Sequence, residues 1–207
     1  MNSDVLSIQS GLKSLGYAVG DLDGVFGPKT RAAAENWLAA GGAAVPAMKR
    51  HASGIIFQGR SGYPVTEIVL HCSATRSDWM AGSGLAAQVT EIRRWHVVDR
   101  GWSDIGYHWV VGRDGDVAPG RSETVIGAGV EGHNRGVIHI CLIGGHGSSS
   151  TDPFSQNFTA EQDHAARRLI ADIAARTPID RISGHNEWAS KACPGFHVPT
   201  WLLEATQ

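Results

Sequence analysis

Two apolar runs constrain the fold of this 207-residue chain more than any other feature. Residues 137–143 form a near-continuous apolar stretch, which is typical of a central strand covered on both faces. Residues 65–73 start with a similar run and become polar at the end, which predicts a second buried strand with His71 at its exit. Strands of this kind need helices on both faces of their sheet.

The segments around these runs supply the remaining elements. Residues 88–98 and 159–177 carry helical apolar spacing, and Thr159 with Gln162 fits a capping box. Further strands are predicted at residues 106–111, from Val117 after an Asp-Gly turn, and at residues 181–183, with an edge strand at 54–58, a mobile surface loop at 144–157 and a terminal helix at 199–203. We therefore predict an α/β fold, with a mixed central sheet flanked by helices and the functional site at one end of its strands.

The first forty residues have a different character. Residues 4–15 show helical spacing that stops at Gly16, residues 20–27 are rich in turn formers, and a second helix is expected from Pro28 to Gly41. Residues 43–53 have no clear period. We predict a small all-α N-terminal domain (1–42), a linker (43–53) and a larger domain (54–207).

Composition excludes several classes of function. The chain is 42% hydrophobic with a net charge of −2, which gives no reason to expect nucleic acid or an anionic membrane as a partner. The three cysteines, Cys72, Cys141 and Cys193, are an odd number without close spacing, which argues against a disulfide framework. Neither a signal peptide nor an apolar run long enough to span a bilayer is visible, so we expect synthesis in a cytoplasm and no membrane insertion.

Residues 184–195 hold the clearest chemical signal. His185 and Cys193 lie eight positions apart with Lys191 two before the cysteine, and imidazole and thiolate are ligands that zinc prefers. A catalytic zinc needs about three protein ligands and one open position, and His71 is the best candidate for the third. Cys72 should point to the face of the strand opposite His71, and we interpret it as a core residue. Cys141 lies within the apolar run 137–143 and is also interpreted as a core residue.

Several histidines and one tyrosine remain. Lys191 is placed to stabilise an oxyanion, and so is Tyr107 if its strand neighbours that of His71. His96 and His108 are expected to pack or to support ligands rather than to bind metal. His133 and Asn134 lie on a loop that could line a substrate groove.

The larger domain resembles the type 2 N-acetylmuramoyl-L-alanine amidases, whose fold is shared by the peptidoglycan recognition proteins. The resemblance covers about residues 54–203. It rests on motifs that recur in order: His71-Cys72-Ser73-Ala74-Thr75, Glu91-Ile92-Arg93-Arg94-Trp95-His96, Gly101-Trp102-Ser103-Asp104-Ile105-Gly106-Tyr107-His108, Arg113-Asp114-Gly115, Cys141-Leu142-Ile143-Gly144-Gly145 and Lys191-Ala192-Cys193-Pro194.

This resemblance implies one Zn²⁺ per chain, bound by His71, His185 and Cys193, with Tyr107 and Lys191 as catalytic helpers. It implies cleavage of the amide between N-acetylmuramic acid and L-alanine, and hence cell-wall degradation and host lysis. A recognition protein that binds muropeptides without cutting them is the main alternative, and the presence of Cys193 favours catalysis. A third possibility, a regulator of RNA polymerase, has no supporting motif.

The N-terminal domain resembles the peptidoglycan-binding type 1 module over about residues 3–42. The resemblance rests on Ile8-Gln9, Leu12, Leu15-Gly16-Tyr17, Thr30, Ala33 and the core Asp23-Gly24-Val25-Phe26-Gly27. It implies wall binding through Asp23, Gly24, Phe26 and Gly27, and a helical cap without a ligand is the alternative. A wall binder in front of an amidase is similar to modular phage endolysins. We therefore expect peptidoglycan as the partner, a monomer, and release to the wall through a holin-like route.

Overall fold

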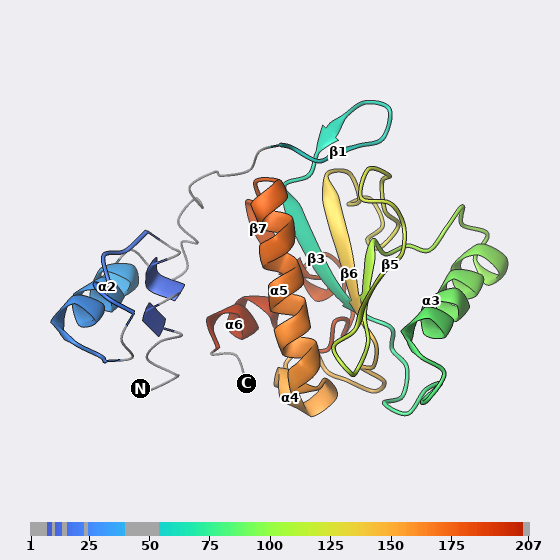
Figure 1. Cartoon of the computed structure of the whole chain (residues 1–207). Coiled ribbons are helices and arrows are strands. Elements are labelled where there is room, and N and C mark those ends of the chain that lie inside the picture. The colour runs from blue at the N-terminus through green and yellow to red at the C-terminus, as the bar shows by residue number, and fades with distance from the viewer. Residues whose placement is uncertain (1–7, 10, 14–15, 23–24, 40–53, 205–207) are drawn as a thin grey trace. The chain divides into compact units, whose positions relative to one another are not determined.

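The computed structural model describes residues 8–9, 11–13, 16–22, 25–39 and 54–204 (Figure 1). The chain divides into two compact units, Met1–His51 and Ala52–Gln207. The predicted linker at residues 43–53 lies outside the described residues, so its boundaries stay a prediction. Each unit is considered by itself below.

The N-terminal unit is helical where it is described. Residues 8–9 and 11–13 are helical, and Gly16 follows with a φ of 85°, the left-handed conformation that commonly ends a helix. Helix α2 (Pro28–Ala39) starts at a proline, whose missing N–H is not needed at that position. The rest of the predicted helix at residues 4–15 lies outside the described residues.

A small core joins these helices. The buried side chains of Leu12, Val19 and Ala33 contact one another, and Trp37 packs against them. The buried Gln9 side chain donates hydrogen bonds to the Val25 carbonyl and to Thr30 Oγ1, both 3.1 Å away. Apolar contacts and a buried polar anchor thus hold the turn-rich loop against the helices.

The larger unit is built on a five-stranded sheet of order β5-β4-β6-β3-β7. Its strands are β3 (Glu67–Cys72), β4 (Trp109–Val111), β5 (Val117–Pro119), β6 (Val137–Leu142) and β7 (Arg181–Gly184). Strand β3 runs parallel to β6 and β7, β4 runs parallel to β6, and β5 returns antiparallel to β4. This confirms the predicted mixed sheet and the hairpin at residues 113–116.

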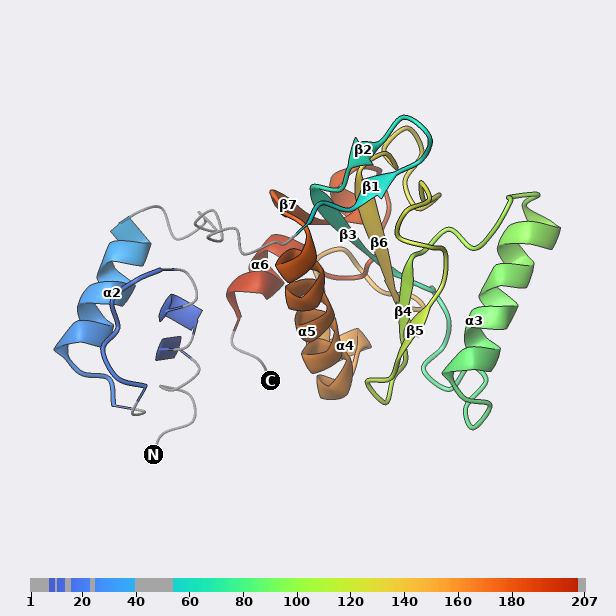
Figure 2. The same ribbon diagram turned by 45° about the horizontal axis from the view of Figure 1, so that its top comes forward.

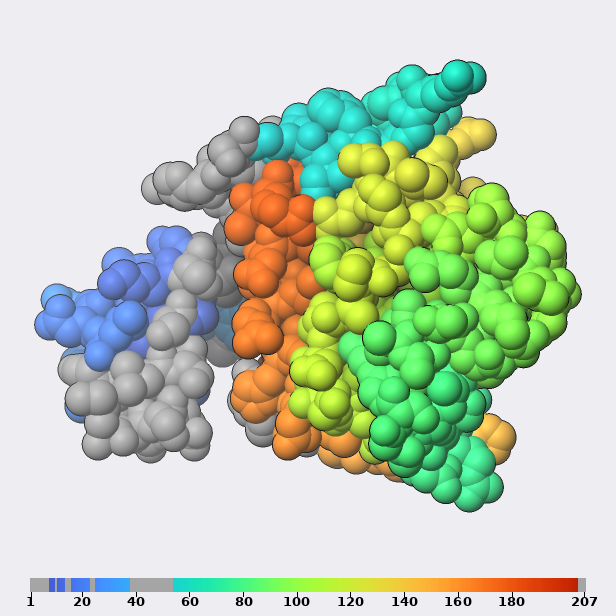
Figure 3. All heavy atoms as spheres, turned by 45° about the vertical axis from the view of Figure 1, so that its right-hand side comes forward, coloured from blue at the N-terminus to red at the C-terminus, as the bar shows by residue number. Residues whose placement is uncertain are grey.

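Side chains alternate between the two faces of a sheet along each strand. Both faces of this sheet carry apolar side chains, and helices cover each of them. Helix α5 (Ala160–Arg176) packs on the face that carries Leu70 and Ile140, together with α4 (Phe154–Asn157) and α6 (Val198–Leu203). Helix α3 (Leu85–Arg94) packs on the other face, against Val110 and Cys141. In Figure 3 the orange atoms of α5 and the green atoms of α3 lie on either side of the yellow-green β5 region. Within the described part of the chain, no helix combines the length and apolar character that crossing a membrane requires.

Three predicted elements differ in the structure. The helix expected at residues 88–98 starts at Leu85, and its last turn is the π-helix Trp95–Asp99. The loop expected at residues 144–157 contains α4, because the apolar side chain of Phe154 is buried in the core. The strand expected at 106–111 is confined to β4: His108 still donates its backbone N–H to the His139 carbonyl of β6, but Gly106 donates to the His96 Nδ1 side chain instead.

The edge strand expected at residues 54–58 is also different. Strand β1 (Phe57–Gln58) pairs only with β2 (Tyr63–Pro64), in a separate hairpin (Figure 2). Its Gln58 side chain donates to the Val137 carbonyl and accepts from the Gly136 N–H. The hairpin therefore covers the N-terminal end of β6, away from His71.

The predicted capping box at Thr159 and Gln162 is present, and Gln162 does more than cap α5. The side chain is fully buried, and its amide donates to the carbonyls of Ile143 and Val111, 2.9 and 3.3 Å away. These carbonyls end two neighbouring strands, so one side chain ties the helix start to the sheet.

We expect Gln162→Ala to lower the free energy of unfolding by about 1–3 kcal/mol, because it leaves buried carbonyls without a donor. Chemical denaturation monitored by circular dichroism measures this loss. The exposed Gln156→Ala is the matched control and should change stability by less than about 0.5 kcal/mol. Equal stability of the two variants would contradict the anchoring role.

Candidate functional site

The parallel strands β3 and β7 bring His71 and His185 to one edge of the sheet. Their register pairs Leu70 with Gly184, so the next residue on each chain is a histidine at the carboxyl end of a strand. The two Nδ1 atoms face each other at 3.2 Å. Neighbouring parallel strands thus place side chains from distant parts of the sequence in contact.

The loop after His185 folds back to deliver Cys193. Asn186 Nδ2 donates to the Phe196 carbonyl at 3.1 Å and closes this loop. Gly184 makes the fold-back possible, because a Cβ atom there would lie 2.9 Å from Pro194 Cδ. Cys193 Sγ consequently lies 3.8 Å from His71 Nδ1 and accepts a hydrogen bond from the Cys72 N–H at 3.3 Å.

These three side chains form a group that could hold a metal ion. One ligand atom from each of His71, His185 and Cys193 lies within 4.8 Å of the others. Burial lowers the pKa of the His71 imidazole well below its ordinary value, and the neighbouring His185 lowers it further. The pKa of His185 is also lowered, first by burial and then by Lys191. Both rings are thus held neutral, the form that binds metals.

Cys72 stays outside this group, as its place in the strand predicts. Its side chain packs in the α5-side core. Gly145 packs closely against this side chain, because a Cβ atom on Gly145 would lie only 2.8 Å from Cys72 Sγ. Cys72 still borders the site, because its backbone N–H donates to Cys193 Sγ and the residue forms part of the pocket wall.

Tyr107 reaches His71 although their strands are not neighbours, the condition on which its role was predicted. Strand β6 lies between β4 and β3, so Tyr107 and His71 are not on neighbouring strands. The ring centroids are nevertheless 5.2 Å apart. The residue opposite His71 on β6 is the small Cys141, and Tyr107 packs against its cluster, so the ring extends over β6.

A pocket of about 420 Å³ opens at this edge of the sheet. It is lined by Cys72, Ser73, Ala74, Ile92, Trp95, His96, Asp99, Arg100, Tyr107, His185, Lys191 and Cys193. Lys191 is exposed at the rim and also lines a neighbouring, more open depression with residues 148–151. The pocket wall therefore includes His185, Cys193 and both predicted helpers, while the fully buried His71 lies behind it in contact with His185 and Cys193.

The electrostatics of the pocket wall follow from burial. Burial raises the pKa of the Tyr107 phenol well above its ordinary value. Burial also lowers the pKa of His96 to about 4, and the nearby Arg100 acts in the same direction. His96 Nδ1 accepts the Gly106 N–H at 3.1 Å, while its ring packs edge-on against Tyr107. His96 thus holds the segment that carries Tyr107.

His133 and Asn134 have partners within the fold. His133 Nε2 lies 2.7 Å from Glu67 Oε2, and its ring stacks on Trp188 with centroids 3.6 Å apart. Asn134 Oδ1 accepts the Val130 N–H at 2.9 Å. Neither residue lines the pocket beside His71, and their role as substrate contacts stays a prediction.

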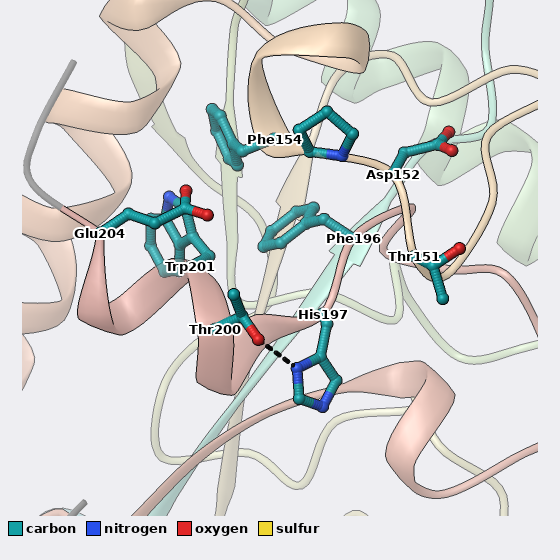
Figure 4. A pocket seen from close by; sticks show the side chains of 9 residues that line it. Thr151, Asp152, Phe154, Phe196, His197, Thr200, Trp201 and Glu204 are labelled. Atoms are coloured by element: carbon teal, nitrogen blue, oxygen red, sulfur yellow. Dashed lines mark hydrogen bonds between the residues drawn. The ribbon is translucent and has the colours of Figure 1, made fainter. Parts of the chain in front are cut away.

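A second pocket of about 420 Å³ lies between the α4 and α6 segments (Figure 4). Phe154, Phe196 and Trp201 present their rings to it, and His197 Nδ1 pairs with Thr200 Oγ1 at 2.8 Å. Asp152 accepts hydrogen bonds from the Ser149 N–H and from Asn157 Nδ2. None of the three side chains grouped at His71 lines it, so we assign it no reaction.

His139 is a neighbour of the site that the sequence analysis did not single out. It is fully buried on β6, and its Nδ1 lies 3.0 Å from His71 Nε2. A signal was present, because His139 is a titratable side chain inside the apolar run 137–143. Such a residue needs a partner in the core, which only the tertiary structure reveals.

In the N-terminal unit, two of the four predicted wall-binding residues are described. The Phe26 ring is 42% exposed, and the Arg31 guanidinium lies 5.8 Å from its centroid. Gly27 accepts the Arg31 N–H at the start of α2. Asp23 and Gly24 lie outside the described residues.

Comparison with protein families gives two matches. Residues 61–196 match the N-acetylmuramoyl-L-alanine amidase family. Residues 1–37 match a peptidoglycan binding domain family.

Individual proteins agree with the first match. The endolysin of Escherichia phage T7 is 38% identical over 134 residues, which cover 65% of this chain and 83% of the phage protein. The solved structure of bumblebee PGRP-SA superposes with a TM-score of 0.55 at 26% identity, covering 70% of this chain and 81% of that one. The amidase LysC of Clostridium intestinale shares the fold, with a TM-score of 0.53 at 23% identity. The superposition covers 67% of this chain and 81% of LysC.

Proposed function

Because the chain belongs to the N-acetylmuramoyl-L-alanine amidase family, we propose that it is a zinc-dependent peptidoglycan hydrolase of the endolysin type. It cleaves the amide bond between N-acetylmuramic acid and L-alanine, and the result is wall degradation and host lysis. The observation that carries the proposal is the meeting of His71, His185 and Cys193 in one group, of which His185 and Cys193 line the pocket.

The donor set fits zinc in chemistry, and its two distances from His71 Nδ1 are close to those of a tetrahedral site. Zinc–nitrogen bonds of about 2.0–2.1 Å and zinc–sulfur bonds of about 2.3 Å put tetrahedral ligands about 3.3 Å (N to N) and about 3.6 Å (N to S) apart. The Nδ1 atoms of His71 and His185 are 3.2 Å apart, and Cys193 Sγ is 3.8 Å from His71 Nδ1. Without metal, the neighbouring Cys72 thiol and burial raise the pKa of the Cys193 thiol well above its ordinary value, and the N–H that Cys72 donates to Cys193 Sγ acts in the opposite direction. Metal binding must therefore displace the thiol proton.

Three protein ligands leave a fourth position for water or substrate, where bound zinc would act as a Lewis acid and lower the pKa of water toward about 7. The protein supplies the rest of the chemistry. Tyr107, held beside His71 by packing on His96 and Cys141, orients the attacking water with its hydroxyl group. Ile92 and Trp95 form an apolar part of the pocket wall, which limits the access of bulk water to the Tyr107 hydroxyl group.

Lys191 acts from the rim of the pocket. Its side chain is exposed and can follow the substrate. There the ammonium group stabilises the oxyanion of the tetrahedral intermediate and gives a proton to the leaving amine. The attacking water, which Tyr107 orients or deprotonates, loses a proton in the same reaction, and this proton restores the ammonium group. The adjacent depression lined by residues 148–151, 186–187 and 189–192 extends the pocket beyond Lys191, as a polymeric substrate requires.

Digestion of purified sacculi tests the proposed reaction. New L-alanine amino termini are expected, and removing zinc with a chelator should abolish their release until zinc is restored. New reducing sugars instead would show a glycosidase, and binding without new ends would show a recognition protein.

The N-terminal unit is proposed to bind the wall. We assign the contact to Asp23, Gly24, Phe26 and Gly27, of which the exposed Phe26 ring offers a stacking surface for sugar. The unit would act through effective concentration, because it holds the enzyme on an insoluble polymer.

The boundaries 1–42, 43–53 and 54–207 lead to a prediction. Residues 54–207 alone should fold, bind zinc and cleave a small soluble muropeptide at close to the full-length rate, because the grouped ligands and helpers all lie there. Lysis and binding of sacculi should fall. Comparison of both proteins on both substrates checks this; equal loss on both would make the N-terminal unit a structural part of the active domain, and equal retention would mean that it does not bind the wall.

We further propose that the enzyme acts as a monomer on the cell wall and reaches it through a holin-like route. Light scattering of the purified protein tests the first point. Lysis of cells that make the enzyme with and without a pore-forming partner tests the second.

A further inference from the structure

His139 forms a buried pair with His71 on the side away from the pocket. The two residues lie on neighbouring strands, where the register pairs His71 with Cys141 and Val69 with His139. Residues two apart on a strand share a face, so His139 and His71 are diagonal neighbours on the same face. Both side chains are 0% exposed, and His139 Nδ1 lies 3.0 Å from His71 Nε2.

The surroundings hold His139 in this position. A Cβ atom on Gly129 would lie 2.6 Å from His139 Nδ1 and 2.8 Å from His71 Nε2, so only glycine lets the chain pass over the pair. On the other side, the His108 ring stacks on His139 with centroids 5.7 Å apart. His108 is itself fixed, because its Nδ1 accepts the His139 N–H and its Nε2 lies 3.0 Å from the Val125 carbonyl.

Two hydrogen arrangements fit the contact between the rings. Either His71 Nε2 donates to His139 Nδ1, or His139 Nδ1 donates to His71 Nε2. A neutral imidazole carries one hydrogen, so only the first arrangement leaves a lone pair on His71 Nδ1, the atom that faces His185 and Cys193. The first arrangement is therefore the one compatible with a ligand role for His71.

We propose that His139 is a positioning residue, which accepts the Nε2–H of His71 and so fixes the tautomer and ring orientation of that zinc ligand. The inference rests on the proposed function, because it concerns the ligand role of His71. This arrangement has a cost: among the described residues, the buried His139 Nε2 has no hydrogen-bond partner. With Nδ1 as the acceptor, the hydrogen of His139 must lie on Nε2, where the fold offers nothing to receive it.

Zinc affinity distinguishes this role from a merely structural one. We expect His139→Leu, which fills the space without an acceptor, to raise the Kd for zinc by about 10–100-fold, the usual effect of losing the hydrogen-bond partner of a ligand histidine. His139→Asn can place its Oδ1 near the position of Nδ1 and should restore most of the affinity. Competition with a chromophoric chelator measures each Kd. Ile140→Ala is the matched control, because it creates a cavity on the same strand but on the face that packs against α5. It should lower the melting temperature without changing the Kd for zinc.

Nitrogen-15 NMR of the zinc-loaded, unaltered protein provides a second readout and does not depend on any variant folding. The imidazole spectrum should show His71 with its hydrogen on Nε2 and His139 with its hydrogen on Nε2. A His71 hydrogen on Nδ1, or equal zinc affinities of the unaltered protein and His139→Leu, would overturn this inference alone. Failure of the unaltered protein to bind zinc would overturn the proposed metal site, and the inference with it.

Discussion

Replacing Cys193 by serine is expected to remove most of the zinc and all measurable amidase activity. A serine hydroxyl is a poor zinc ligand at neutral pH, and it would leave only the two histidines of the group within the described residues. The change should leave the fold intact, because it replaces one sulfur with oxygen on a half-buried loop. Elemental analysis of the purified variant, together with release of L-alanine amino termini from sacculi, measures both effects.

The matched control for this prediction is Cys141→Ser. It makes the same chemical change in a buried thiol outside the ligand group, so it should cost stability and keep the zinc. A full zinc content with normal turnover in Cys193→Ser would show that the assigned ligand set is wrong.

Tyr107→Phe and Lys191→Ala should each lower turnover by about 10²-fold or more while zinc content stays at one per chain. This is the scale of losing an acid–base or oxyanion-stabilising group. Tyr107→Phe removes only the hydroxyl and keeps the ring packed against His71 and His96. Initial rates on a soluble muropeptide, with zinc measured on the same samples, check the expectation.

Control variants separate chemistry from packing. Tyr63→Phe, in the β1–β2 hairpin at the other end of the sheet, should keep the full rate. Lys191→Arg keeps the charge but changes its shape and reach, so it should retain part of the rate if charge is what matters. A normal rate for Tyr107→Phe or Lys191→Ala would remove that residue from the mechanism.

Features that depend on local spacing were predictable from the sequence. The Asp-Gly turn at residues 114–115 predicted the β4–β5 hairpin, and Thr159 with Gln162 predicted the start of α5. Both are set by contacts between residues a few positions apart. The alternation of strand side chains likewise separated His71, which faces the site, from Cys72, which packs in the core.

The ends of elements and the partners of short segments were less predictable. Residues 54–58 have the composition of an edge strand, but β1 found its partner in β2 rather than in the main sheet. The polar segment 144–157 was predicted to be a loop but contains helix α4, because its apolar residue Phe154 is buried against distant parts of the core. In both cases, the pairing of the strand and the formation of the helix, the outcome depended on packing against other parts of the chain.

The sequence by itself identified the candidates for the chemistry: His71, His185 and Cys193 with a nearby lysine have the donor types and charge that the proposed reaction needs. The tertiary structure decided how they meet. Strand order put β6 between Tyr107 and His71, and the small Cys141 let the ring cross that gap. It also paired His133 with Glu67 and set His139 behind His71. The physical reason is that donor type is a property of one residue, whereas a hydrogen bond between two strands depends on register, which the packing of the whole core fixes.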